Sequence, residues 1–165
     1  MRMNVPVPEY CRSRVVVLGC GNTLLGDDGF GPAVTEYLNE HCRTPADVVV
    51  LDAGTAVREI LFDIILSEIK PQKIIIVDAL DCNRTPGEIF SVSIEDIPER
   101  NIHDFSVHQM PTLNMLKELR DLCNVEVIVL AAQPENIPEN AKPGLSQKIE
   151  EAVVKTSEYI AKTYF

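Results

Sequence analysis

Short apolar runs alternate along this chain with segments whose apolar residues recur at helical spacing. Four runs rich in β-branched residues predict buried strands, at 14–18, 48–51, 73–77 and 125–130. Four segments with apolar residues three and four positions apart predict helices, at 32–40, 57–65, 111–122 and 146–164. Strands that alternate with helices indicate an α/β fold: a three-layer sandwich with a mostly parallel, twisted sheet and helices on both faces.

One further strand is expected at an edge of this sheet. Residues 88–93 have a strand pattern, but they follow the run at 73–77 too closely for the helical crossover that parallel pairing requires. We therefore expect this strand to be antiparallel. Segments 95–107 and 133–144 lack periodicity, which predicts long loops of the kind that carry function. A length of 165 residues favours a single domain, 1–165, with an N-terminal tail at 1–13.

Charge and cysteine content narrow the choice of partner and compartment. The chain has 25 acidic and 15 basic residues, a formal charge of −10, which argues against nucleic acid or an anionic membrane surface as a partner. No apolar run approaches the roughly 18 residues of a spanning helix, so a cytoplasmic protein is expected. Five scattered cysteines without a C-x-x-C pair indicate reduced thiols rather than a disulfide framework or a zinc knuckle.

A glycine-rich turn at 19–31, G-C-G-N-T-L-L-G-D-D-G-F-G, joins the first strand to the first helix. It imitates a dinucleotide-binding turn, but Leu24 stands at the third glycine position, where it should block close packing of the helix on the strand. It also imitates a phosphate loop, but Asp27 and Asp28 stand where Lys and Ser or Thr are needed. Two carboxylates would repel a phosphate, so the turn favours a cation over a nucleotide.

Acidic residues follow each of the first three strands. Asp27 and Asp28 come after the first strand, Asp52 after the second and Asp78 after the third. In an open parallel sheet ligands bind beyond the carboxyl ends of the strands, where these side chains would meet. Strand-end aspartates also cap turns and helices, which is the structural alternative for each of them. Gathered together, they would raise one another's pKa values unless a cation lay among them.

Three histidines could complete a metal site. His41 has charged neighbours and is expected at the surface, whereas His103 and His108 fall in the long loop. His108 directly precedes a predicted helix, whose dipole disfavours the imidazolium and keeps the ring in the neutral form that a metal requires. Asp28, Asp78 and His108 would form a set compatible with Zn²⁺ or Ni²⁺ that leaves positions open for a substrate group. Cys20 is interpreted as a small residue that fills the turn.

Several motifs, in order over nearly the whole chain, resemble those of the hydrogenase maturation endopeptidases. They are G-x-G-N-x-L-L-x-D-D-G-F-G at 19–31, D-x-G-T at 52–55, V-D-A at 77–79 with P-G at 86–87, S-x-H-Q at 106–109, P-E at 134–135 and G-L-S at 144–146. Ala53 departs from the pattern, because the family commonly has glycine there. The G-C-G-N and D-D-G-F-G-P wording is most similar to the branch that serves deazaflavin-reducing hydrogenases of methanogens.

The resemblance implies a sheet of five strands, four parallel and one antiparallel, and a proteolytic activity. Such an enzyme removes a short C-terminal extension from the precursor of a [NiFe] hydrogenase large subunit once nickel has been inserted. The family's metal-binding positions fall on Asp28, where many relatives have Glu, and on Asp78 and His108. These residues would contact nickel carried by the substrate, with Zn²⁺ or another divalent cation as a substitute in vitro. The family is usually monomeric.

The sequence leaves two mechanisms for the protease and two functions other than proteolysis as alternatives. The metal could polarise the scissile carbonyl and activate water, or it could only position the peptide while Asp28 or Asp52 acts as general base, since the family has also been classed as aspartic-type. A non-catalytic chaperone or hydrogenase subunit that binds nickel or the large subunit in the same cleft is the main alternative function. A nucleotide-binding regulatory module is a third, disfavoured by the turn at 19–31.

Overall fold

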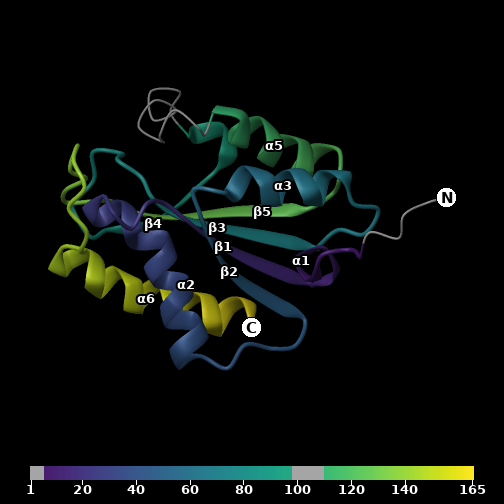
Figure 1. Ribbon diagram of the computed structural model, residues 1–165, viewed down its shortest axis with the longest axis horizontal. Helices are drawn as coiled ribbons and strands as arrows, with labels where there is room; N and C mark the ends of the chain where they lie inside the picture. Colours follow the sequence, from purple (N-terminus) through teal and green to yellow (C-terminus); the bar gives the residue numbers. More distant parts are fainter. Residues whose placement is uncertain (1–5, 98–109) are drawn as a thin grey trace.

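The computed structural model describes residues 6–97 and 110–165 and contains a five-stranded sheet with helices on both faces (Figure 1). The strands are β1 (Val15–Cys20), β2 (Val48–Gly54), β3 (Lys73–Ala79), β4 (Ile89–Val92) and β5 (Glu126–Ala132). The helices are α1 (Glu9–Arg12), α2 (Phe30–His41), α3 (Val57–Leu66), α5 (Met110–Asp121) and α6 (Gln147–Tyr164), with 3₁₀ turns η1 (Gly26–Gly29) and η2 (Ile94–Asp96).

The strand order is β2-β1-β3-β5-β4. The pairs β1–β2, β1–β3 and β3–β5 are parallel, and β4 pairs antiparallel with β5 at the edge. The predicted α/β fold and its antiparallel edge strand are therefore confirmed. The chain passes from β1 outward to β2 and then returns to the other side of β1 as β3, so the strand order reverses between β1 and β3. This reversal is where an open α/β sheet usually places its ligand.

Two apolar cores lie on opposite faces of the sheet, because successive strand residues point to opposite sides. Val16 and Leu18 of β1 face α3 and α5, whereas Val15 and Val17 face α2 and α6 (Figure 1). Within the predicted N-terminal tail, residues 9–12 form the short helix α1. Its Cys11 is fully buried in the core beneath α3. Among the described residues, no helix combines the length and the apolar character needed to cross a bilayer.

Helix α2 packs unusually close to the sheet through Gly31. A Cβ built on Gly31 would lie 2.2 Å from the backbone oxygen of Cys20 and 2.3 Å from that of Val77. The expectation that Leu24 would block close packing is therefore wrong, because Leu24 is 55% exposed and turns away from the contact. Gly31 makes the close helix–strand contact that a dinucleotide-binding turn assigns to its third glycine, at position 24.

Strands β2 and β3 extend further than their apolar runs predict. Asp52 pairs with Gly19, and Asp78 pairs with Ala131, so both aspartates lie inside the last residues of their strands rather than after them. Backbone pairing with the neighbouring strand continues beyond the apolar residues, a feature that side-chain periodicity does not report. Both carboxylates are consequently held on rigid backbone.

Candidate functional site

Three carboxylates meet at the carboxyl edge of the sheet. Asp28 lies in η1 directly after β1, Asp52 near the end of β2, and Asp78 near the end of β3. All three surround Cys20, the last residue of β1. Burial is the main reason that the pKa of the Cys20 thiol is raised well above its usual value, and Asp78, Asp52 and Asp28 raise it further by charge repulsion. The predicted gathering of strand-end acids is thus present, with Cys20 buried among them.

Each of these three carboxylates is oriented by one backbone amide. Asp28 Oδ2 accepts the N–H of Asn22 at 2.8 Å, Asp52 Oδ1 accepts that of Gly54 at 2.9 Å, and Asp78 Oδ1 accepts that of Ala79 at 2.8 Å. Among residues 6–97 and 110–165, no hydrogen bond or ion pair occupies the second oxygen of any of them. The side chains are therefore fixed in direction, and each has one oxygen available to a ligand or a water molecule.

The turn at Gly21 brings two of the carboxylates together. Gly21 has φ +133°, and a Cβ there would lie 1.9 Å from the backbone oxygen of Asp28 and 3.7 Å from Asp78 Oδ1. Only glycine fits between η1 and the end of β3 in this conformation. The sequence signal for this contact is the second glycine of the turn.

Burial raises the pKa values of Asp28 and Asp78, and the charge on Asp28 raises that of Asp78 further. Asp78 is 3% exposed, and its pKa lies well above 3.8, first because of desolvation and second because of the charge on Asp28. Desolvation likewise raises the pKa of Asp28, opposed by the hydrogen bond from Asn22. The predicted repulsion acts on Asp78, with burial as the larger cause, whereas for Asp28 burial is the cause that raises the pKa. A cation bound between them would favour both ionised forms.

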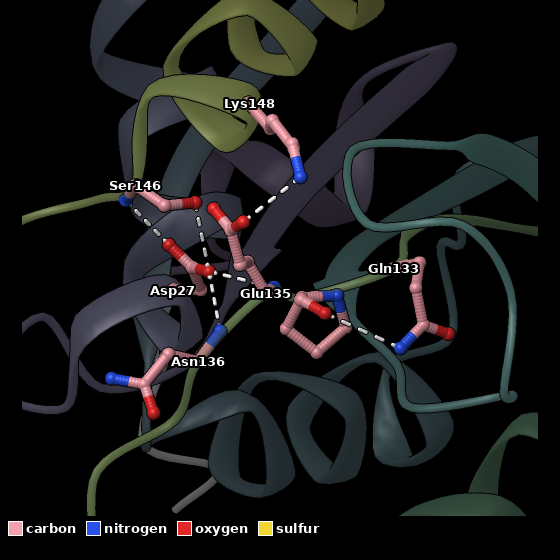
Figure 2. Close-up of polar contacts among 7 residues, drawn as sticks. Asp27, Gln133, Glu135, Asn136, Ser146 and Lys148 are labelled. Carbon is pink, nitrogen blue, oxygen red and sulfur yellow. Dashed lines mark hydrogen bonds and ion pairs between the residues drawn. The ribbon is translucent and has the colours of Figure 1, made fainter.

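Asp27, the neighbour of Asp28, has a different role (Figure 2). It is 1% exposed, and both of its oxygens are occupied by the segment after β5. Oδ2 accepts the N–H groups of Glu135 at 2.8 Å and Asn136 at 2.9 Å and the hydroxyl of Ser146 at 3.0 Å, while Oδ1 accepts the N–H of Ser146 at 2.7 Å. Asp27 therefore fastens the 133–146 loop to η1 and has no oxygen left for a ligand.

A second buried side chain, Gln133, orders the loop after β3. Its Oε1 accepts the N–H groups of Cys82 at 2.9 Å and Arg84 at 3.0 Å, and its Nε2 donates to Asp81 Oδ1 at 3.0 Å. Nε2 also donates to the carbonyl of Pro134 at 3.3 Å. Figure 2 marks this contact with the dashed line from Gln133. The loop that follows Asp78 is thereby tied to the end of β5.

A groove of about 510 Å³ opens at the end of β2, beside Asp52. Its lining comes from the turn after β1, the outer face of α2, the end of β2 and the 133–146 loop: Thr23, Gly26, Gly29, Pro32, Ala33, Thr35, Glu36, Asn39, Asp52, Gly144 and Leu145. Asp52 is the strand-end carboxylate that reaches this groove. The contribution of α2 was not predicted, because Glu36 and Asn39 have the spacing of an ordinary solvent-facing helix surface.

The three histidines and Ala53 are the remaining residues that the sequence singled out. His108, the third proposed metal ligand, and His103 lie outside the described residues. Within the described part of the chain, no group of three His, Cys, Asp or Glu side chains is arranged to hold a metal ion. His41 is exposed, as predicted, and stacks on Tyr37 with ring centroids 4.3 Å apart. Ala53 is buried in the core without a positive φ, so this position does not require glycine.

Comparisons with known proteins agree with the resemblance. A family profile for hydrogenase maturation proteases matches residues 32–163. A Methanocaldococcus jannaschii protein named as a hydrogenase maturation protease is 37% identical over 88% of this chain and 93% of its own length. The coenzyme F420 hydrogenase subunit delta of Methanothermobacter thermautotrophicus is 31% identical over 90% and 92%. The solution structure of the Escherichia coli endopeptidase HycI superposes with a TM-score of 0.73 at 30% identity, covering 90% of this chain and 89% of that one.

Proposed function

We propose that this chain, which belongs to the hydrogenase maturation protease family, is an endopeptidase. Its substrate is the precursor of a [NiFe] hydrogenase large subunit, from which it removes the C-terminal extension after nickel insertion. The relative named as a subunit of coenzyme F420 hydrogenase is compatible with the branch that serves deazaflavin-reducing hydrogenases, but it does not assign this chain to that branch. Five free cysteines are consistent with a reducing cytoplasmic setting for this reaction.

The observation that carries this proposal is the difference between Asp27 and the three aspartates beside it. Asp27 uses both oxygens to hold a loop, whereas Asp28, Asp52 and Asp78 each have one oxygen oriented by a backbone amide and one without a partner in the described residues. Carboxylates left in this state, at the point where strand order reverses, suit a cation and a reacting water molecule.

We assign the metal-facing role to Asp28 and Asp78, together with His108. The pKa values of both aspartates are raised by burial, and that of Asp78 also by the charge on Asp28, so nickel carried by the substrate would relieve a repulsion that exists in the free protein. Two carboxylates and an imidazole also accept Zn²⁺, which could substitute in vitro. Asp52 or Asp28 would act as general base, since each has an oxygen free to hold the attacking water.

One specific observation favours a second candidate function. A relative that matches 90% of this chain is named as a subunit of a hydrogenase. A protein of this family could therefore remain bound to a hydrogenase without cutting it, as a nickel- or large-subunit-binding assembly chaperone or subunit. The same strand-end carboxylates would then recognise the nickel-loaded subunit and perform no chemistry.

Mass spectrometry of the precursor separates the two functions. The protein is incubated with nickel-loaded and with nickel-free large-subunit precursor, and binding is followed in parallel by size-exclusion chromatography. We expect the loaded precursor to lose one C-terminal peptide and the nickel-free precursor to stay intact. Stable co-elution with an intact loaded precursor would establish the chaperone or subunit function instead. Equal cleavage of both precursors would show that the protein does not recognise nickel in its substrate.

Three isosteric variants test the assigned residues. Asp28→Asn, Asp52→Asn and Asp78→Asn each retain the backbone hydrogen bond and remove the charge. We expect each to slow cleavage of the loaded precursor by roughly 10²-fold or more, the range of a lost acid–base or metal contact. Asp47→Asn is the matched control, because Asp47 precedes β2 at the opposite end of the sheet and, within the described part of the chain, its side chain forms an ion pair with Arg14 alone. A control that lost as much activity would show that overall charge, not the site, governs the rate.

A further inference from the structure

The groove beside Asp52 continues along α2 into a second hollow. This hollow has a volume of about 200 Å³ and shares Ala33, Glu36 and Leu145 with the first. Its remaining lining comes from the last turns of α2 and the first turns of α6: Tyr37, Glu40, His41, Glu150, Val153 and Val154. The two helices lie on the same face of the sheet (Figure 1). Together the two hollows form one path, here called the α2–α6 groove, which leads away from the strand-end carboxylates.

Acidic side chains line the whole path. Asp52 stands at one end, Glu36 at the junction of the two hollows, and Glu40 and Glu150 at the far end. Among the described residues, neither hollow has a Lys or Arg in its lining. Lys142 lines a smaller hollow of about 170 Å³ that shares Gly26, Gly144 and Leu145 with the first. The ion pairs in the described part of the chain include Glu88, Glu95, Glu126 and Glu135 but none of the four groove carboxylates. The negative charge of the groove is therefore uncompensated within the described residues.

The spacing of these carboxylates suits a row of positive charges rather than one metal ion. No three of them come together as a metal-binding group in the described residues. Between them the surface is apolar, with Ala33, Leu145 and Val153 as shared or neighbouring lining. Lysine and arginine have long apolar stems that pack on such a surface while the charged head reaches a carboxylate. An acidic or phosphorylated chain would be repelled over the same path.

We propose that the α2–α6 groove binds a basic, extended segment of the substrate's C-terminal extension. This proposal rests on the proposed function for the identity of the bound chain. Its geometry is continuous with that function, because Asp52, one of the two candidate bases, lines the near end of the groove. Peptide on one side of the scissile bond would face Asp28 and Asp78, and the segment to be removed would run along α2 towards Glu40 and Glu150.

Peptide binding tests the groove without relying on proteolysis. The probe is a fluorescently labelled, flexible peptide with lysines spaced by glycine and alanine, and its counterpart has glutamate in place of each lysine. Anisotropy is measured at about 20 mM and about 500 mM salt, because exposed charges are largely screened at the higher value. We expect the lysine peptide to bind at low salt, to weaken at high salt, and to shift backbone amide NMR signals of α2 and α6. The glutamate peptide should not bind.

Two triple variants separate the groove from the overall charge. Glu36→Gln/Glu40→Gln/Glu150→Gln removes three groove charges and should weaken low-salt binding of the lysine peptide about tenfold, as expected for three exposed ion pairs. Glu59→Gln/Glu68→Gln/Glu118→Gln removes three exposed charges from the α3–α5 side and should change binding by no more than about twofold. Equal losses in both triples, or amide shifts away from α2 and α6, would overturn the proposal.

The same variants test whether the groove contributes to cleavage of the large-subunit precursor. With nickel-loaded precursor, the groove triple should raise KM about tenfold and leave kcat within about twofold, since uniform binding is lost and the reacting groups are intact. An unchanged KM would refute the assignment of the segment to the substrate's extension. If the wild-type protein binds the precursor but does not cut it, the proposed function fails. The peptide measurement still decides whether the groove binds basic chains.

Discussion

Replacing Asp27 with asparagine tests the claim that this carboxylate fastens the 133–146 loop to η1. Asparagine has almost the same shape but only one acceptor oxygen. In the better orientation of the asparagine, its oxygen keeps the three contacts of Oδ2, with Glu135, Asn136 and the Ser146 hydroxyl. The new NH₂ then faces the N–H of Ser146, which in the wild type donates to Asp27 Oδ1 at 2.7 Å. Two donors then point at each other in a site that is 1% exposed.

The size of the effect follows from these four contacts. A buried donor left without an acceptor costs about 1–3 kcal/mol, and each contact that changes from a charged to a neutral acceptor loses roughly 0.5–1 kcal/mol. Desolvation of the carboxylate, which the variant avoids, offsets part of this sum. We expect a net loss of about 2–4 kcal/mol in the free energy of unfolding. For a chain of this length that corresponds to a fall in Tm of roughly 5–15 °C.

Calorimetry and hydrogen exchange measure the global and the local effect. Exchange of the amides of Glu135, Asn136 and Ser146 should accelerate in the variant, because their acceptor is weakened. Asp28→Asn is the control: it keeps its one hydrogen bond from Asn22 and should change stability by less than about 1 kcal/mol. Unchanged protection of these three amides together with an unchanged Tm would refute the fastening role of Asp27.

Two further predictions concern the buried site and the helix contact. Because the pKa of Asp78 is raised on folding, the native state binds more protons than the unfolded chain at pH values between 3.8 and the raised pKa. Stability therefore falls as pH rises through that window. Urea titrations should find Asp78→Asn about 1–2 kcal/mol more stable than wild type at neutral pH, with the difference lost below pH 3.8. A variant no more stable at neutral pH would contradict this account of Asp78. Gly31→Ala places a methyl group 2.2 Å from the Cys20 carbonyl and should destabilise the fold by about 3 kcal/mol or more, whereas Asn114→Ala on the exposed side of α5 should be nearly neutral in the same thermal scans. Near-wild-type stability of Gly31→Ala would show that α2 does not sit against β1 as described.

The sequence predicts the architecture well because each core residue takes part in a repeating pattern. The β-branched runs in β1 and β3 and the helical stripes of α2 and α6 each report burial locally, and the short spacing before β4 excludes a parallel crossover. The antiparallel edge follows from that spacing alone. The error at Leu24 arose because a motif position was equated with a spatial one, whereas the close contact is made by Gly31.

The site was only partly predictable, because hydrogen bonding between distant segments leaves no local signal. Asp27 and Asp28 are identical neighbours in the sequence, yet one is fully bonded to residues more than a hundred positions away and the other accepts a single amide from its own turn. The α2–α6 groove escaped prediction for a similar reason: Glu36 and Glu150 belong to helices that meet only in the folded chain. The role of His108 stays a prediction, since it lies outside the described residues.

Whether this protein cuts a nickel-loaded large-subunit precursor is decided by the intact mass of that precursor, recorded before and after incubation. We predict the loss of a single C-terminal peptide from the loaded precursor, no loss from the nickel-free one, and a strongly reduced rate with Asp78→Asn. A loaded precursor that keeps its full mass while it co-elutes with the wild-type protein would contradict the claim.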